Sequence, residues 1–166
     1  MRLLDFLSIP CIKAPLAATT KQAAIMELVD VLVAADKCKS GQLLKDAVWT
    51  REQTRTTGIG DGLAIPHGKC SGVESLAIAI GKPAAPMDFA AIDGKPVKLI
   101  ILLASPPDKT SDHIQALANI SKLMSMAEFR QRVYQASTAA EIYELFKSQD
   151  PGAPGTPGAP VAAAKP

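Results

Sequence analysis

The sequence has few aromatic residues, no excess of charge of one sign and no long apolar run. Only 4% of its 166 residues are aromatic, and 18 basic residues nearly balance 16 acidic ones, for a net charge of +2. Nucleic-acid binders normally carry a basic stripe or stacking aromatic side chains, so that class is excluded. The longest apolar-rich runs, 29–35 and 99–104, are too short to cross a bilayer, so we expect no direct membrane insertion.

Cysteine is also scarce. The chain has three cysteines, Cys11, Cys38 and Cys70, an odd number without a CxxC pair. This usage predicts free thiols in a reducing compartment. An acidic residue comes as early as Asp5, which argues against a secretory signal peptide. Together these features predict a cytoplasmic protein.

The chain is 48% hydrophobic and 20% charged, which predicts one globular domain with a sizeable core. We place this domain at residues 1–148. Residues 149–166 differ, because proline and glycine recur every three residues from Pro151 onward. That composition predicts a disordered, partly extended tail or linker.

The spacing of apolar residues predicts the order of helices and strands. Helices are expected over 20–37, 42–52, 113–124, 127–134 and 138–147. Strands are expected over 63–65, 76–80 and 97–103, and a glycine- and threonine-rich loop over 54–62. Thr20 is the expected cap of the first helix, and Ser111 or Asp112 that of the third. This order predicts an α/β fold, a three-layer sandwich whose mixed parallel and antiparallel sheet is flanked by helices.

Only two histidines are present, His67 and His113. His67 lies between Pro66 and Gly68, at the predicted exit of a strand. Proline restricts the backbone and glycine removes bulk, so the imidazole can project with open space on one side. Neutral imidazole is a good nucleophile near pH 7 and can also leave again. His67 therefore suits reversible phosphoryl transfer.

Such transfer needs positioning, together with donors or cations for the phosphoryl oxygens. The planar guanidinium of Arg51 matches phosphate oxygens, and His113 stands at a predicted helix start, where a second imidazole can meet backbone donors. Each residue also has a plainer interpretation: a satisfied histidine, a solvated helix-end cation and a residue of a helical first turn. Spacing alone does not bring the three together.

Two other site chemistries are rejected on spacing. Gly58, Gly60 and Gly62 alternate strictly and precede a strand, whereas the dinucleotide fingerprint needs its third glycine one place later, before a helix. His67 and Cys70 are spaced like two metal ligands, but no further ligands accompany them. We therefore expect no metal site and no cofactor.

Within residues 3–146, a recognisable pattern is formed by Arg51-Glu52 and the blocks 56–60, 64–69, 91–97 and 112–118. These blocks are similar to the fructose/mannitol (type 2) family of phosphotransferase-system enzyme IIA domains, which includes a nitrogen-regulatory branch. The most specific block is the run Ala-Ile-Pro-His-Gly that contains His67. The loop that surrounds the phosphorylated cysteine of an enzyme IIB domain is missing around Cys70.

The resemblance implies that His67 is phosphorylated on Nε2 by the phosphocarrier HPr or a paralogue. It places His113 and Arg51 around the phosphoryl group, and Asp61 and Thr57 in its wider environment. It implies either transfer onward to an EIIB cysteine for sugar uptake or signalling of the phosphorylation state to a regulatory target. The alternative is a regulatory module of the same fold that binds partners without phosphoryl relay.

Overall fold

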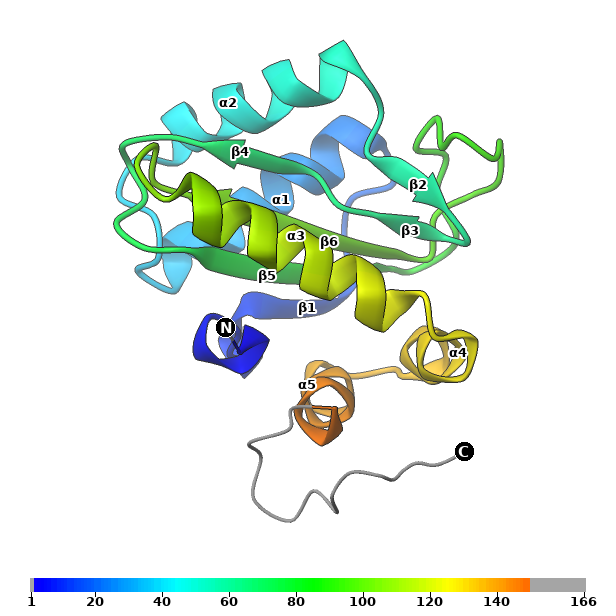
Figure 1. The fold of residues 1–166 in the computed structure, drawn as a ribbon. Coiled ribbons are helices and arrows are strands. Elements are labelled where there is room, and N and C mark those ends of the chain that lie inside the picture. Colours follow the sequence, from blue (N-terminus) through cyan, green and yellow to red (C-terminus); the bar gives the residue numbers. More distant parts are fainter. Residues whose placement is uncertain (1, 150–166) are drawn as a thin grey trace.

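The computed structural model describes residues 2–149, in which helices cover both faces of a mixed sheet (Figure 1). The strands are β1 (Ile12–Leu16), β2 (Gly58–Gly60), β3 (Leu63–Ala64), β4 (His67–Lys69), β5 (Ala77–Pro83) and β6 (Leu99–Ser105). The helices are α1 (Lys21–Ala34), α2 (Gly41–Thr54), α3 (Thr110–Met124), α4 (Ala127–Gln135) and α5 (Ala139–Ser148), after short 3-10 turns η1 (Leu3–Asp5) and η2 (Ile9–Cys11). The predicted α/β sandwich is confirmed.

Strand β6 is the centre of the sheet, whose order is β1-β5-β6-β3-β2. It pairs antiparallel with β5 on one side and parallel with both β3 and β4 on the other. Leu63 lies opposite Leu99 and His67 opposite Leu103, so β3 and β4 keep one register along β6. Strands β3 and β4 therefore run along the same side of β6 as two segments, separated by residues 65 and 66.

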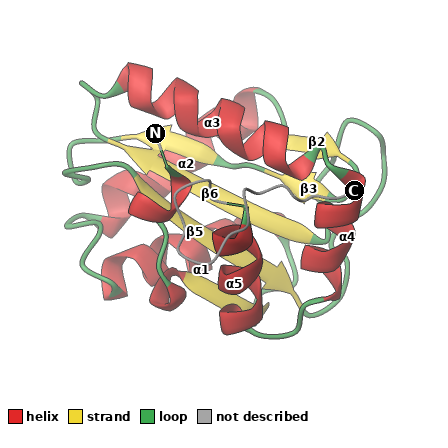
Figure 2. Ribbon diagram, turned by 60° about the horizontal axis from the view of Figure 1, so that its bottom comes forward, coloured by secondary structure: helices red, strands yellow, loops and turns green. Residues whose placement is uncertain are grey.

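Two hydrophobic clusters lie on opposite faces of this sheet. Helices α1 and α2 pack with Ile100, Leu102 and Ala104 on one face. Helices α3, α4 and α5 pack with Leu99, Ile101 and Leu103 on the other, the near face in Figure 2. Successive side chains of a strand point to opposite faces, so β6 is buried on both sides and reads as a continuous apolar run.

The helix predictions are confirmed to within a few residues, but one predicted cap is wrong. Thr20 accepts a hydrogen bond from the N–H of Ala23, and Thr138 forms a capping box with Glu141. Neither Ser111 nor Asp112 caps α3, because the helix already begins at Thr110 and both residues lie inside its first turn. Lys109 occupies the cap position without a side-chain hydrogen bond.

Three short strands, β1, β2 and β4, were not predicted. Strand β4 begins at His67, beyond the end of the predicted strand 63–65. Strand β2 lies inside the expected loop 54–62, because its glycines have little intrinsic strand propensity and depend on pairing with β3. Strand β1 contains Pro15, which is tolerated there because β1 is an edge strand. None of the helices in residues 2–149 has the length and apolar character needed to span a membrane. The predicted tail, apart from residue 149, lies outside the described residues.

Candidate functional site

His67 was predicted at the exit of the strand 63–65, and it is the first residue of a further strand, β4. Its Nδ1 atom lies 2.8 Å from the carbonyl oxygen of Ile65. A carbonyl oxygen only accepts hydrogen bonds, so Nδ1 of the neutral ring is the donor. The lone pair then resides on Nε2, which makes Nε2 the nucleophilic atom of this half-buried side chain.

The interruption between β3 and β4 creates this hydrogen bond. Pro66 has no N–H, and its carbonyl accepts the N–H of Leu103 on β6. Ile65 does not bond to β6 through its N–H, which it donates to the carbonyl of Thr57, 3.0 Å away. The carbonyl of Ile65 is thereby left for the ring of His67.

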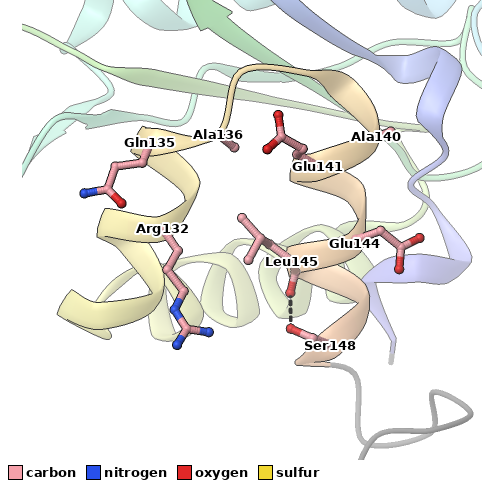
Figure 3. A pocket seen from close by; sticks show the side chains of 8 residues that line it. All are labelled: Arg132, Gln135, Ala136, Ala140, Glu141, Glu144, Leu145 and Ser148. Carbon is pink, nitrogen blue, oxygen red and sulfur yellow. Dashed lines mark hydrogen bonds between the residues drawn. The ribbon is translucent and has the colours of Figure 1, made fainter.

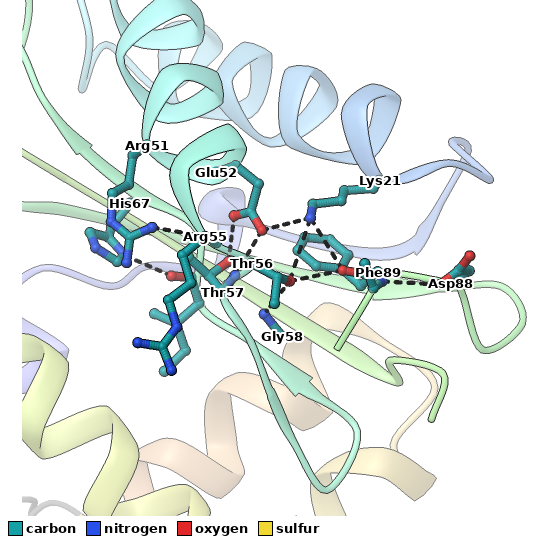
Figure 4. Close-up of polar contacts among 12 residues, drawn as sticks. Lys21, Arg51, Glu52, Arg55, Thr56, Thr57, Gly58, His67, Asp88 and Phe89 are labelled. Carbon is teal, nitrogen blue, oxygen red and sulfur yellow. Dashed lines mark hydrogen bonds and ion pairs between the residues drawn. The ribbon is translucent and has the colours of Figure 1, made fainter. Parts of the chain in front are cut away.

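Gly68 brings helix α2 close to β4. A Cβ atom at Gly68 would lie 2.9 Å from Cγ2 and 3.0 Å from the backbone nitrogen of Val48, so only glycine allows this approach without a shift. The last turn of α2 then carries Arg51 beside His67 (Figure 4). Because side chains alternate along a strand, His67 and Lys69 point away from α2, toward α3.

His113 meets His67 from the first turn of α3. The two ring centroids lie 5.3 Å apart with the planes at 63°. His113 is buried, and its Nδ1 lies 2.6 Å from the hydroxyl of Ser105, the last residue of β6. The pairing of the two histidines, which spacing could not establish, is therefore present in the fold.

The site carries two cations and two histidines with lowered pKa values. Burial lowers the pKa of His67 below 6.5, and the charges of Arg51 and Lys69 lower it further, against the Ile65 hydrogen bond and the charge of Glu52. Burial, followed by the charges of His67 and Lys69, lowers the pKa of His113 to about 4. Both rings are therefore neutral at pH 7, one able to attack phosphorus and the other to donate a hydrogen bond.

Arg51 and Lys69 are held by different elements, α2 and β4. Arg51 is half-buried and donates from Nη1 to the carbonyl of Arg55, 2.8 Å away, which holds its guanidinium at the end of α2. Lys69 is exposed and donates from Nζ to the hydroxyl of Thr110 at the start of α3, 3.1 Å away. Lys69 is the last residue of the block 64–69, but its sequence context predicts no role for it.

Thr57 and Asp61 have structural contacts of their own. The hydroxyl of buried Thr57 donates to Glu52, at 2.5 Å. Asp61 lies in the β2–β3 turn with φ of +57°, donates its N–H to Asp93 and accepts the hydroxyl of Tyr134 on its carbonyl. The places that the resemblance gave Thr57 and Asp61 near the phosphoryl group stay predictions.

A separate surface hollow lies between α4 and α5 (Figure 3). Its lining consists of Arg132, Gln135, Ala136, Ala140, Glu141, Glu144, Leu145 and Ser148, and includes none of the predicted site residues. Within residues 2–149 no group of three or more histidine, cysteine or acidic side chains is arranged to hold a metal ion. The cysteines Cys11, Cys38 and Cys70 are free and buried.

Comparison with known families places the chain. The model for the phosphoenolpyruvate-dependent sugar phosphotransferase system EIIA 2 family matches residues 5–149, so the chain belongs to this family. The fructose-specific EIIABC component of Bacillus subtilis is 32% identical over 150 residues, which are 90% of this chain and 24% of that protein. The chain thus spans about a quarter of that relative.

Relatives of similar length carry two kinds of name. The fructose-specific EIIA component of Haloferax volcanii is 32% identical, over 76% of this chain and 82% of that protein. The nitrogen regulatory protein of Klebsiella oxytoca is also 32% identical, over 87% and 90%. The crystal structure of the nitrogen regulatory protein IIA-Ntr from Neisseria meningitidis aligns with a TM-score of 0.80 at 28% identity, covering 87% of this chain and 98% of that one.

Three residues of the site carried too little sequence signal to be assigned. In the sequence, Ser105 lies near the expected end of a strand, and Glu52 is a carboxylate at a helix end, directly after Arg51. Lys69 reads as a solvated lysine. Their connection to the site is visible only in the structure. Ser105 contacts His113, Glu52 contacts Thr57, and the charge of Lys69 lowers the pKa of both histidines.

Proposed function

We propose that this protein is a phosphohistidine carrier in which Nε2 of His67 accepts a phosphoryl group from an HPr-type phosphocarrier and passes it on. The observation that carries the proposal is the hydrogen bond between Nδ1 of His67 and the Ile65 carbonyl, since it leaves Nε2 free as a nucleophile. Membership in the EIIA family supports the same chemistry.

The transfer needs no cofactor. The Nε2 lone pair of His67 attacks phosphorus, and the N–P bond of the carrier's phosphohistidine breaks as the new N–P bond forms. The carrier leaves with a neutral imidazole, and positive charge appears on the ring of His67. The Nδ1–H bond to Ile65 strengthens as that charge develops, because a cationic donor forms the stronger hydrogen bond.

His113 and the two cations have complementary roles in this proposal. Neutral His113 accepts from the Ser105 hydroxyl on Nδ1 and carries its proton on Nε2, which can donate to a phosphoryl oxygen. Arg51 and Lys69 offset the negative charge of the phosphoryl group on either side of His67. After transfer, the added charge of about −2 changes the surface that a partner meets.

The decisive experiment is phosphorylation with purified enzyme I, HPr and phosphoenolpyruvate, followed by mass spectrometry under non-acidic conditions. Wild type gains one acid-labile phosphate, and His67→Ala gains none. If wild type stays unmodified with HPr and with its paralogues, the proposal is wrong. Equal phosphate on His67→Ala would move the phosphorylation site elsewhere.

The phosphorylated protein either passes its phosphate to an EIIB cysteine or signals its phosphorylation state to a regulatory target. The fold is shared with the Escherichia coli mannitol IIA in its complex with phosphorylated IIB, at a TM-score of 0.73 and 20% identity over 84% of this chain and 96% of that one. Nitrogen regulatory relatives of similar length give the regulatory role equal support. Incubating the phosphorylated protein with the EIIB proteins of its own organism separates the two, since sugar uptake requires transfer of phosphate to a cysteine and regulation does not.

A further inference from the structure

We propose that Glu52 is a positioning residue for His67: its carboxylate fixes Thr57, and through Ile65 it holds the imidazole with Nδ1 bonded and Nε2 free. The inference rests on the proposed function and deepens it. Glu52 does not touch the ring directly. It acts through a chain of hydrogen bonds that connects the end of α2 to the start of β4 (Figure 4).

The carboxylate of Glu52 is buried, with only 3% of the residue exposed, at the last turn of α2. A buried carboxylate is costly unless donors surround it. Here Oε2 accepts the N–H of Thr57 at 2.7 Å and the ammonium of Lys21 at 2.8 Å, while Oε1 accepts the hydroxyl of Thr57 at 2.5 Å. The two hydrogen bonds to Thr57 hold both its backbone and its side chain in place.

Thr57 passes this constraint to the active histidine. Its carbonyl accepts the N–H of Ile65 at 3.0 Å, and the carbonyl of Ile65 accepts Nδ1–H of His67 at 2.8 Å. Ile65 lies in the interruption between β3 and β4, so it belongs to neither strand. Its position, and therefore the direction of the carbonyl that orients the ring, depends on Thr57.

Lys21 completes the cluster from the start of α1. Its ammonium also donates to the carbonyl of Phe89 at 3.2 Å and lies 4.9 Å from the centre of the Phe89 ring. It therefore offsets the charge of Glu52, which would otherwise repel a phosphoryl dianion near Arg51. The charge of Glu52 does reach His67, because it opposes the lowering of the His67 pKa.

A matched control exists on α1. Glu27 accepts the backbone N–H groups of Ala17 and Ala18 at 2.9 and 2.8 Å and pairs with Lys13 at 2.6 Å. Like Glu52, it accepts from a lysine and from loop N–H, although a second loop N–H takes the place of the hydroxyl donor of Glu52. Its partners lie on and just after the edge strand β1, at the opposite end of the sheet order from β2 and β3.

The test compares Glu52→Gln and Thr57→Val with Glu27→Gln in two measurements. The first is the ¹⁵N NMR spectrum of the His67 ring in unphosphorylated protein, which reports which nitrogen carries the proton. The second is the rate of phosphorylation against carrier concentration. We expect a mixed tautomer and a saturating rate lowered about tenfold for both site variants, with little change in KM, because misplacing a reacting group slows chemistry more than binding.

Glu27→Gln should keep the wild-type tautomer and rate, even where it lowers stability. Thr57→Ser, which keeps the hydroxyl, should lie closer to wild type than Thr57→Val. The inference is overturned if Glu52→Gln and Thr57→Val match Glu27→Gln in both measurements. If wild type accepts no phosphate, the proposed function fails instead, and the NMR comparison still decides whether Glu52 orients His67.

Discussion

His67 and His113 are the same side chain in adjacent positions, yet their surroundings give them opposite chemistry. Nδ1 of His67 faces a backbone carbonyl, which can only accept, whereas Nδ1 of His113 faces the hydroxyl of Ser105, which can donate. The first ring therefore offers a lone pair at Nε2. In the proposed function the Ser105 hydroxyl donates, so the second ring offers an N–H at its Nε2. In the proposed function, two rings whose centroids lie 5.3 Å apart thus become nucleophile and donor through the hydrogen-bond partners of their Nδ1 atoms.

Burial adds to this difference. His113 is 4% exposed, and burial lowers its pKa to about 4. The pKa of half-buried His67 is lowered by burial and by the charges of Arg51 and Lys69. Neither ring is charged at pH 7, so neither repels the cations beside it. The proposed attack needs a neutral His67, because a protonated ring has no lone pair to attack with.

The largest expected effect is the difference in phosphorylation between variants that lack His67 and variants that lack His113. His67→Ala should abolish acid-labile phosphate, whereas His113→Ala should still accept phosphate, with transfer to and from the carrier slowed about a hundredfold because one oxyanion donor is lost. Mass spectrometry and single-turnover transfer measure the two effects. Normal turnover in His113→Ala would contradict the donor role of His113.

Acid should destabilise the fold through His113. A histidine whose folded pKa lies below its unfolded value of about 6.5 stabilises the protein above that pH, and this contribution is lost as the pH falls toward 4. Between pH 7 and 4.5 the loss should amount to roughly 2 kcal/mol. Urea unfolding of wild type and His113→Asn at both pH values measures it, because the other titrating groups cancel in the difference. An equal drop in both proteins would show that His113 is not the group responsible.

Removing the hydroxyl beside His113 should weaken the preference of its ring for one tautomer. In Ser105→Ala, Nδ1 of His113 loses its partner, so either tautomer can form and Nε2 no longer has to carry the proton. We expect transfer to slow about tenfold, the effect of losing one hydrogen bond. Ser125→Ala is a suitable control, since Ser125 is exposed and donates to a backbone carbonyl at the end of α3. A wild-type ring spectrum for His113 in Ser105→Ala would contradict this account.

The smallest expected effect concerns charge beside His67. Neutralising Arg51 as Arg51→Gln should move the pKa of His67 upward, because a neighbouring cation disfavours the imidazolium. Lys69→Gln should move the His67 pKa in the same direction by less. NMR titration of the ring in unphosphorylated protein measures both changes. A downward shift in either variant would mean that its cation does not act on His67.

Some of this arrangement was predictable from sequence, since local pattern carried it. The apolar run 97–103 predicts the central strand, and the spacing over 127–134 and 138–147 predicts α4 and α5. Strand β2 was missed, because its three residues pair only in the context of β3. The caps proposed at Ser111 and Asp112 were wrong by two and three residues, since α3 begins at Thr110 and Lys109 is at the cap position.

Sequence by itself determined that His67 stands between Pro66, which has no N–H, and Gly68, which has no side chain, so that its backbone is constrained on one side. It also carried the motif by which the family is recognised. Only the tertiary structure decided what His67 meets, because His113, Arg51 and Glu52 lie 46, 16 and 15 residues away along the chain. Hydrogen bonds and burial between such distant residues depend on sheet register and helix packing, and these fix the tautomer and the charge state of the ring.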